Sequence, residues 1–342
     1  MAINRICSLK DCSWLPLESL RNSTLFITGG TGLVGHDLID RLVEIQAEYC
    51  LKIIALVRDE QKARKIFSPY ADRIHYIVGD VTQPIHVDEP IDYIIHGAAI
   101  TSSQTFIEKP VETIITSING TRNVLELAKA KNVRSVVYMS SMEAYGSPQI
   151  ERPLTEDQVD YLNPLSLRSS YPESKRLCEN LCVAYAKEYN ISVKIARLAL
   201  TFGPGILPSD RRVLIQFINS ALRNQNIEIK TSGKSARMYL YTFDATTALL
   251  TLLLKGEAAT AYNLANKETY CSIRQLADLV TVVTGSSSLV LTDTGSQAEK
   301  GMYPPDSFLY LDTSRLEALG WKACVSMQEG LAALVQSLED KV

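Results

Sequence analysis

Three side chains near the middle of the chain have the types and the spacing of a proton-transfer centre. Tyr171 and Lys175 lie four residues apart, one turn from each other on one face of a helix. A phenol with a pKa of ~10 is a poor base at neutral pH, but a nearby ammonium and a positively charged nicotinamide ring favour the phenolate. Ser141 follows a predicted strand and can orient the reacting hydroxyl or carbonyl. This arrangement predicts that Tyr171 exchanges a proton while a hydride passes to or from a nicotinamide.

A glycine cluster near the start of the chain has the spacing of a dinucleotide-binding turn. Gly29, Gly32 and Gly35 lie directly between an apolar run and a helical pattern. Such a turn requires a tight bend, close approach of the backbone to a pyrophosphate and close packing of helix on strand. The helix N-terminus offers N–H groups and a partial positive charge to the phosphates. We expect the same turn to contribute Thr31, Leu33 and Val34 to the cofactor site.

The end of the second apolar run selects the cofactor. A carboxylate there would bind the adenosine ribose and repel a 2′-phosphate, but Ile53–Val57 is followed by Arg58. A guanidinium can pair with a 2′-phosphate through two hydrogen bonds. Arg58 therefore favours NADP(H). NAD(H) stays open if Asp59 holds the ribose and Arg58 points to solvent.

Residues after the third and fourth apolar runs complete the predicted cofactor site. Asp80 either accepts a hydrogen bond from the adenine amino group or caps a turn, and Val81 follows it. Ala98 and Ala99 are small enough to let the cofactor lie across the sheet edge. We expect His96 to be packed or hydrogen-bonded rather than to act as a base.

These residues require an α/β fold to bring them together. Helical patterns such as Val111–Lys131 and Tyr171–Tyr189 alternate with short apolar runs, namely Leu25–Thr28, Ile53–Val57, Ile74–Val78, Tyr93–Ile95, Ser135–Met139 and Val193–Ala196. Continuous apolar strands that alternate with helices predict a parallel sheet covered on both faces. We therefore expect a Rossmann-type doubly wound parallel sheet that binds ligands at the carboxyl ends of its strands.

The alternation weakens after Thr201, which suggests a second, smaller unit. We assign residues 22–200 and about 239–265 to a dinucleotide-binding Rossmann domain, about 201–238 and 266–340 to a C-terminal substrate-binding lobe, and 1–21 to an N-terminal extension. Gly295–Asp306 is predicted to be a mobile loop. The helices expected in the second half are Arg211–Arg223, Asp244–Leu254, Ile273–Thr284, Ser314–Leu319 and Gln328–Leu338.

Composition excludes several classes of function. The 342 residues carry a net charge of -3, with 46% hydrophobic and 21% charged residues, so neither a nucleic-acid footprint nor disorder is indicated. The seven cysteines are odd in number and form no C-x-x-C pair, which favours free thiols over a metal site. The apolar runs are shorter than the ~20 residues that span a bilayer. We expect a cytoplasmic protein without a metal or a membrane anchor.

The motifs together resemble the extended short-chain dehydrogenase/reductases of the NAD(P)-dependent nucleotide-sugar epimerase/dehydratase family. The resemblance runs from about Leu25 to Asn266. The matching stretches are Thr28–Gly35, His96–Ala99, Asn119–Thr121, Ser140–Gly146, Tyr171–Lys175, Arg197–Pro204, Gly233–Asp244 and Tyr262–Leu264. It implies a Rossmann domain for the dinucleotide and a C-terminal lobe that closes over a nucleoside-diphosphate sugar.

The resemblance also assigns roles to residues. It makes Ser141, Tyr171 and Lys175 the catalytic trio, and it makes Glu143 a base or a sugar-positioning group, as in dehydratases and decarboxylases of the family. Arg237 would bind the substrate's phosphates or a sugar carboxylate, or else form an ion pair within the protein. The stretch Asn163–Arg176 is similar to the UDP-glucuronate decarboxylase branch.

Four features depart from the family pattern. One is that the chain reads Arg237-Met238-Tyr239 where the family usually has R-D-F. Arg58 replaces the acidic residue usual in the NAD-using branch, and Leu200 replaces an Asn that reaches the substrate in many relatives. Met142 replaces the residue that dehydratases use as their acid. Leu200 and Met142 remain predicted substrate contacts, and these changes argue against a standard 4,6-dehydratase.

Three functions stay open. The leading hypothesis is an epimerase, dehydratase or decarboxylase of a nucleotide sugar that uses its cofactor transiently. The second is an NADPH-dependent reductase of a nucleotide-linked keto sugar, favoured by Arg58 and Met142. The third is a catalytically silent dinucleotide sensor, disfavoured because Tyr171 and Lys175 are both present. By resemblance, we expect a homodimer that pairs helices Val111–Lys131 and Tyr171–Tyr189.

Overall fold

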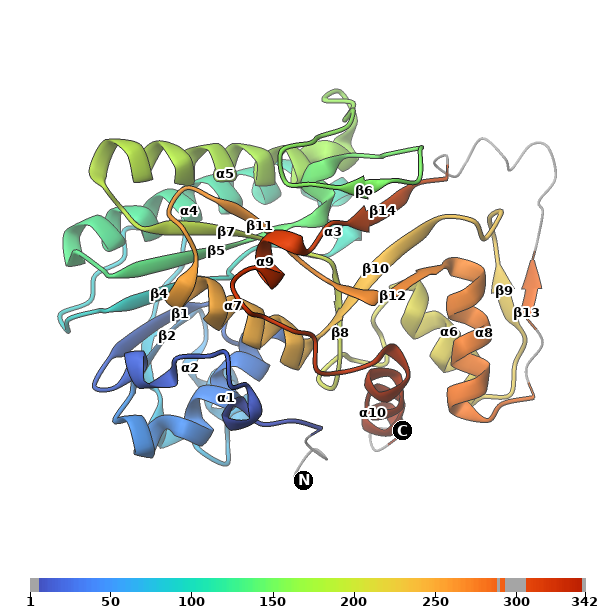
Figure 1. The fold of residues 1–342 in the computed structure, drawn as a ribbon, viewed down its shortest axis with the longest axis horizontal. Helices are drawn as coiled ribbons and strands as arrows, with labels where there is room; N and C mark the ends of the chain where they lie inside the picture. Colours follow the sequence, from blue (N-terminus) through green and yellow to red (C-terminus); the bar gives the residue numbers. More distant parts are fainter. Residues whose placement is uncertain (1–5, 288–289, 293–305, 340–342) are drawn as a thin grey trace.

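The structure is a computed structural model that describes residues 6–287, 290–292 and 306–339. Within these residues, seven parallel strands form the main sheet in the order β11-β7-β5-β4-β1-β2-β3 (Figure 1). The strands are β1 (Thr24–Thr28), β2 (Lys52–Val57), β3 (His75–Val78), β4 (Tyr93–His96), β5 (Ser135–Ser141), β7 (Val193–Leu198) and β11 (Ala261–Leu264). Six of the seven coincide with the predicted apolar runs to within a few residues.

Helices cover both faces of this sheet. One face packs against α1 (Leu33–Tyr49) and α7 (Thr242–Lys255), whose apolar side chains join one hydrophobic cluster. The other face packs against α4 (Pro110–Lys131) and α5 (Ser170–Tyr189) in a second cluster. Figure 1 shows α4 and α5 side by side above the strands and α1 and α7 below them. The prediction of a doubly wound Rossmann-type sheet is confirmed.

Two short helices follow strands of the main sheet. α2 (Glu60–Ile66) lies between β2 and β3, and Asp59 caps its first turn by accepting a hydrogen bond from the N–H of Lys62. α3 (Ser103–Glu108) lies between β4 and α4, and Ser102 caps it in the same way. Neither helix was predicted from the sequence.

A smaller lobe lies beside the main sheet (Figure 1). The described helices of the second half match the predicted ones closely: α6 (Val213–Leu222), α8 (Ile273–Thr284), α9 (Ser314–Glu317) and α10 (Met327–Glu339). Of these, α9 packs against β11 of the main sheet. The strands of the smaller lobe were not predicted. They are β6 (Pro153–Leu154), β8 (Leu200–Phe202), β10 (Ala236–Tyr241), β12 (Asn266–Ser272) and β14 (Phe308–Leu311), joined in a mixed sheet, and the pair β9 (Ile227–Ile229) and β13 (Val290–Thr292). The predicted loop Gly295–Asp306 lies outside the described residues except for Asp306.

None of the described helices has both the length and the apolar character needed to cross a membrane. The N-terminal segment packs on the main sheet's helices through two short 3-10 helices, Leu9–Asp11 and Leu17–Leu20, whose leucines are buried. Arg41 of α1 donates a hydrogen bond to the carbonyl of Cys7 and fixes this segment further.

Candidate active site

The glycine turn after β1 forms a cradle that side chains would fill. Gly29 has a φ of +76°, and a Cβ there would lie 2.5 Å from the carbonyl carbon of Gly97. A Cβ on Gly35 would lie 2.3 Å from the carbonyl oxygen of Gly29. Gly32 is the N-cap of α1 and leaves the helix without a side-chain cap. The turn therefore fits the phosphates of a dinucleotide, which the α1 N–H groups would hold.

Hydrogen bonds of Thr28 fix the ends of β1 and β4 beside this cradle. Its Oγ1 lies 2.7 Å from Nδ1 of His96 and accepts from the N–H of Ala98 at 3.2 Å. His96 is buried, and burial together with the charge of Lys175 lowers its pKa to about 3. His96 is therefore neutral and hydrogen-bonded, as predicted. Ala98 and Ala99 follow it and are half-buried.

The residues expected at the adenosine end occupy two neighbouring strand ends. Arg58 is exposed after β2, and its positive charge helps to lower the pKa of the Asp80 carboxyl, which lies after β3. The main causes of that lowered pKa are the N–H and the hydroxyl of Thr82, which donate to Asp80 Oδ1 at 2.8 and 2.7 Å. Asp80 thus caps a turn, which was one of its two predicted roles. Asp59 is already bound by its cap on α2.

Two predicted cofactor residues point their side chains into the core. Val34 is buried in the α1 face of the sheet, and Val81 is buried against the position of Gly120 on α4. The carbonyl of Val81 accepts a hydrogen bond from Asn123. Thr31 is exposed at the turn, and Leu33 is partly buried there.

The structure brings Ser141, Tyr171 and Lys175 together. β5 ends at Ser141, and α5 carries Tyr171 and Lys175 in its first two turns. The Ser141 side chain lies close enough to the Tyr171 phenol to lower its pKa. The Nζ of Lys175 lies 5.7 Å from the centre of the Tyr171 ring and donates to the carbonyl of Met139 at 2.7 Å. Tyr171 is 8% exposed and Lys175 is 3% exposed.

Burial shifts the proton affinities of Tyr171 and Lys175. It raises the pKa of Tyr171, as does the charge of Glu143, whereas the hydrogen bond from Ser141 and the charge of Arg168 lower it. Burial lowers the pKa of Lys175 to about 8. In this arrangement the Arg168 guanidinium is a cation that lowers the pKa of the phenol. Tyr171 is a neutral phenol in this structure.

Glu143 lies beside this centre and is paired with Arg168. Nη2 of Arg168 donates to both carboxylate oxygens of Glu143, at 2.8 and 2.7 Å. The guanidinium lies 4.9 Å from the centre of the Phe106 ring. The Phe106 ring in turn stacks on Tyr171 with 4.3 Å between centroids and an interplanar angle of 8°.

Sequence reasoning did not assign a role to Arg168 or Phe106. Arg168 stands three residues before Tyr171, inside the stretch that resembles decarboxylases, and this placement was an available signal. Phe106 lies on α3 and no motif surrounds it, so only its packing on Tyr171 reveals it.

Besides Ser141 and Glu143, the three other predicted substrate residues occupy different environments. Met142 is buried in the hydrophobic core, so its side chain is part of the packing. Leu200 on β8 is partly buried and pairs in register with Tyr239 of β10. Arg237 lies two residues earlier on β10, and its side chain makes no hydrogen bond or ion pair with any described residue.

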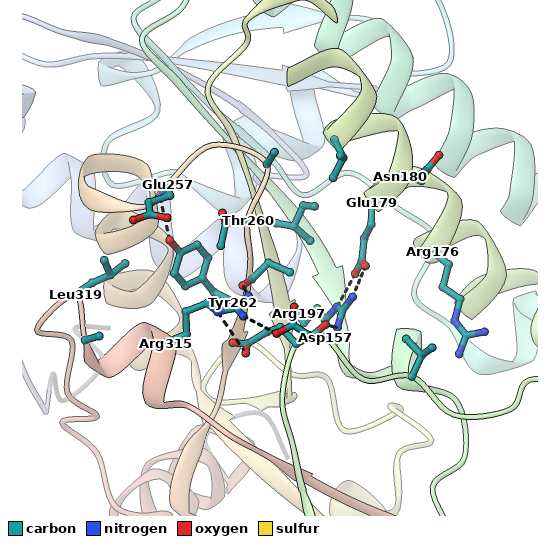
Figure 2. A pocket seen from close by; sticks show the side chains of 17 residues that line it. Asp157, Arg176, Glu179, Asn180, Arg197, Glu257, Thr260, Tyr262, Arg315 and Leu319 are labelled. Carbon is teal, nitrogen blue, oxygen red and sulfur yellow. Dashed lines mark hydrogen bonds and ion pairs between the residues drawn. The ribbon is translucent and has the colours of Figure 1, made fainter. Parts of the chain in front are cut away.

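A pocket of about 720 Å³ lies elsewhere, between α5, β7, β11 and α9 (Figure 2). Ion pairs line it, including Arg197 with Glu179 and Arg315 with Asp157. Among the described residues that line it, none is a predicted site residue. Glu179 nevertheless belongs to α5, the helix that carries Tyr171 and Lys175.

The described residues hold no cluster of His, Cys, Asp or Glu side chains able to bind a metal ion. All seven cysteines are free thiols, and Cys178 and Cys182 are buried in the α5 face of the core.

Comparisons with known proteins agree with this geometry. The model of the family described as "NAD dependent epimerase/dehydratase family" matches residues 25–265. UDP-glucuronic acid decarboxylase 1 of Xenopus tropicalis is 31% identical over 310 residues, which cover 90% of this chain and 70% of that protein. UDP-glucuronic acid decarboxylase 6 of Arabidopsis thaliana is 30% identical over 324 residues, or 92% of this chain and 91% of that protein.

A solved structure shows the same fold. UDP-glucose 4-epimerase of Thermotoga maritima, determined with UDP-glucose, superimposes with a TM-score of 0.78 at 22% identity. The superposition covers 93% of this chain and 99% of that one.

Proposed function

Since this chain belongs to the NAD dependent epimerase/dehydratase family, we propose that it is an NAD-dependent enzyme that decarboxylates a nucleoside-diphosphate-linked uronic acid. The main support for this proposal is the position of three groups of residues in the fold. The glycine cradle, the Ser141–Tyr171–Lys175 cluster and the Glu143–Arg168 pair all lie at the carboxyl ends of the parallel strands or directly beside them. The similarity to UDP-glucuronic acid decarboxylases over nine-tenths of the chain supports the reaction class.

The chain's own residues supply proton transfer and orientation. A bound nicotinamide supplies the acceptor, and later the donor, of a hydride. Tyr171 takes the proton of the sugar hydroxyl that becomes a ketone and later returns it. Ser141 donates a hydrogen bond to the same oxygen, and the Lys175 ammonium favours the phenolate form of Tyr171. Phe106, stacked on the Tyr171 ring, fixes the plane of the phenol.

A carboxyl group on the carbon next to a ketone is lost readily as carbon dioxide. Oxidation of the neighbouring hydroxyl carbon gives a β-keto acid. The electron pair of the breaking C–C bond is then delocalised onto the ketone oxygen as carbon dioxide departs. A proton then replaces the carboxyl group, and the ketone is reduced back to a hydroxyl, chemistry that a bound nicotinamide would supply. The net reaction consumes one proton and releases one carbon dioxide per turnover.

Two arginines are placed to bind the substrate's anions. Arg237 has no partner among the described residues and can pair with the diphosphate or the sugar carboxylate. Arg168 keeps a buried Nη1 that has no hydrogen-bond partner within the described part of the chain. This donor lies next to Glu143, where a sugar carboxylate beside Tyr171 would be repelled unless a cation balanced the two charges. The lobe that contains β10 and α6 would then hold the nucleotide sugar.

We take NAD as the cofactor because the family is described as NAD dependent. The predicted preference for NADP(H) rests on Arg58 alone, and the comparisons give it no support. Arg58 is exposed and lies near Asp80. The measurement is the pair of dissociation constants of NAD and NADP for wild type and Arg58→Ala. We expect the NAD value to change less than about threefold, whereas a large selective loss of NADP binding would restore the 2′-phosphate role.

The reaction is tested by incubating the purified protein with NAD and a nucleoside-diphosphate uronic acid, with product analysis by mass spectrometry. We expect a nucleotide pentose, carbon dioxide and no lasting change in nicotinamide absorbance. The corresponding neutral nucleotide sugar is the matched control substrate. Conversion of the neutral sugar alone would indicate an epimerase or dehydratase. Stoichiometric consumption of NADPH with a nucleotide-linked keto sugar would indicate the reductase.

We also propose that the protein forms a homodimer through α4 and α5. Large apolar side chains are exposed on both helices, including Val111 at 72% and Ile115 at 46% on α4 and Leu177 at 50% on α5. α4 and α5 pack against each other along one face of the sheet (Figure 1). Such an exposed apolar surface is typical of an interaction site.

A further inference from the structure

Glu179 connects the two elements that carry the candidate catalytic residues. It lies one helical turn beyond Lys175 on α5, and Lys175 lies one turn beyond Tyr171. Its Oε1 accepts a hydrogen bond of 2.5 Å from Oγ of Ser140. Ser140 directly precedes Ser141 at the end of β5. The carboxylate therefore ties the catalytic face of α5 to the end of β5 through a buried contact.

Arg197 of β7 holds the other side of the same carboxylate. Its Nε donates to Oε1 of Glu179 at 3.0 Å and its Nη2 to Oε2 at 2.7 Å. Its Nη1 donates to the carbonyl of Glu156 at 2.9 Å. Figure 2 shows the two side chains aligned in the wall of the pocket between α5 and β11. The carboxylate is thus fixed by three hydrogen bonds from two strands.

The pair is buried, with the Arg197 side chain 8% and the Glu179 side chain 10% exposed. A buried ion pair gives little net stability compared with apolar residues of the same volume, and a well-attested use of such polar groups is to fix one arrangement of the parts that they join. Here the joined parts are α5, β5 and β7. Their relative position decides how Ser141 faces Tyr171.

We propose that Glu179 is a positioning residue of the catalytic centre, which keeps Ser141 in register with Tyr171 and Lys175 and sustains the positive charge of Lys175. This inference rests on the proposed function, because that function gives the three residues their roles. Glu179 itself contacts neither the reacting atoms nor the predicted cofactor path.

The surroundings of Lys175 support the second part of the proposal. The titratable groups that face it are His96 from β4, Tyr138 from β5, and Tyr171, Cys178, Glu179 and Cys182 from α5. Burial lowers the pKa of Lys175, whereas Cys178, Glu179 and Cys182 raise it. Of these three, Glu179 supplies a carboxylate and the others supply thiols. Arg197 of β7 forms an ion pair with Glu179.

The experiment compares Glu179→Gln, which keeps the shape of the side chain, with Ser140→Ala, which removes only the link to β5. Glu188→Gln is the matched control, because it removes a carboxylate from the exposed C-terminal end of α5. Two quantities are measured on the full-length protein. The first is kcat and KM for the nucleotide sugar. The second is the titration of the Lys175 side chain, followed by NMR of protein with 13C-labelled lysine and assigned with Lys175→Arg.

We expect kcat to fall about 10- to 100-fold in both variants, with KM changed less than about threefold, because displaced catalytic groups cost rate more than binding. In Glu179→Gln the Lys175 resonance should titrate about one pH unit lower than in wild type, since a nearby opposite charge is lost. Glu188→Gln should match wild type in both measurements. A residue that serves only stability would lower the unfolding midpoint and leave kcat and the titration unchanged.

The inference is overturned if Glu179→Gln keeps the wild-type kcat and the wild-type Lys175 titration. Should that variant fail to fold, a wild-type kcat in Ser140→Ala overturns it. Absence of turnover by the wild-type protein on every nucleotide sugar refutes the proposed function instead. The Lys175 titration then decides the present inference, because it needs no substrate.

Discussion

At Tyr171, two neighbours of opposite charge act on the same phenol. Glu143 raises its pKa and Arg168 lowers it, and these two side chains also bind each other. A change in that pair therefore changes the proton affinity of the proposed base. An anionic substrate that draws Arg168 towards itself would act on Tyr171 through this contact. The negative charge of the substrate would thus change the pKa of Tyr171 through the Glu143–Arg168 pair.

Lys175 sets a pH limit on the reaction. Burial lowers its pKa to about 8, so its ammonium is lost as the pH rises through that value. We expect kcat/KM for the nucleotide sugar to fall above about pH 8, up to tenfold per pH unit. Lys175→Arg, although slower, should lack this fall because a guanidinium stays protonated. A wild-type profile that stays level to pH 10 would contradict the assigned role.

The shifted pKa of Lys175 also makes the free energy of unfolding depend on pH. The folded pKa of about 8 lies below the usual 10.5, so the unfolded chain binds more protons between these values. The contribution of Lys175 to the free energy of unfolding therefore rises with pH across that window.

Ser141, Tyr171 and Lys175 could be predicted from the sequence, because their positions depend on the helix or strand that carries them. Tyr171 and Lys175 share a helix, and a spacing of four residues places them on one face whatever the rest of the fold does. Ser141 follows a strand whose end position is fixed by sheet topology. Phe106 could not be found this way, because it meets Tyr171 through packing of α3 against the start of α5.

At the level of elements, the parallel arrangement does most of the positioning. β1, β4 and β5 are neighbours in the sheet, so Thr28, His96 and Ser141 emerge at one edge. α1 begins at the same edge and packs its first turn on the β1–α1 glycines. The close contact of Gly35 with the carbonyl of Gly29 leaves no room for a side chain.

Gly35→Ala tests whether the glycine turn between β1 and α1 binds the cofactor. The new Cβ would lie 2.3 Å from the Gly29 oxygen, so the turn must open. We expect a loss of about 1–3 kcal/mol in the free energy of unfolding and NAD binding weakened at least tenfold, measured by urea denaturation and calorimetry. Gly285→Ala is the control. Its φ of +62° also disfavours alanine, but nothing lies within 4 Å of its Cβ, so NAD binding should stay unchanged. Equal NAD affinity in Gly35→Ala would refute the cradle.

The strands of the second lobe could not be predicted from the hydrophobic pattern of the sequence. β6 has two residues, β8 has three, and β10 is nearly continuously buried. Short runs of this kind cannot be told from helix or loop by periodicity. Their pairing is also non-local, since β14 joins β10 to β6. The helices α6 and α8, by contrast, have regular apolar faces, and their predicted ranges match the structure closely.

At the scale of the whole molecule, the exposed faces of α4 and α5 lie on the side of the main sheet opposite α1 and α7 (Figure 1). A two-fold interface between identical copies would cover both faces at once. The proposed four-helix contact would also lie next to α5, on which Tyr171 and Lys175 stand. Assembly and catalysis would then share one helix.

We expect light scattering to give twice the chain mass of 37.9 kDa for the wild-type protein. Ile115→Asp places a charge on the exposed face of α4 and should give the monomer mass, because an unpaired charge in an apolar interface is costly. Ile150→Asp is the matched control. Ile150 is 73% exposed but lies in a loop outside both helices, so this variant should remain a dimer. A monomeric wild-type protein would refute the dimer.

The most direct test of the central claim is turnover of a nucleoside-diphosphate uronic acid by Tyr171→Phe, measured beside NAD affinity in the same preparation. Phenylalanine keeps the ring that stacks on Phe106 and removes only the hydroxyl. The account predicts a loss of at least about 100-fold in kcat, in line with the removal of a general acid–base, with NAD bound as in wild type. Wild-type turnover by Tyr171→Phe would contradict the proposed catalytic centre.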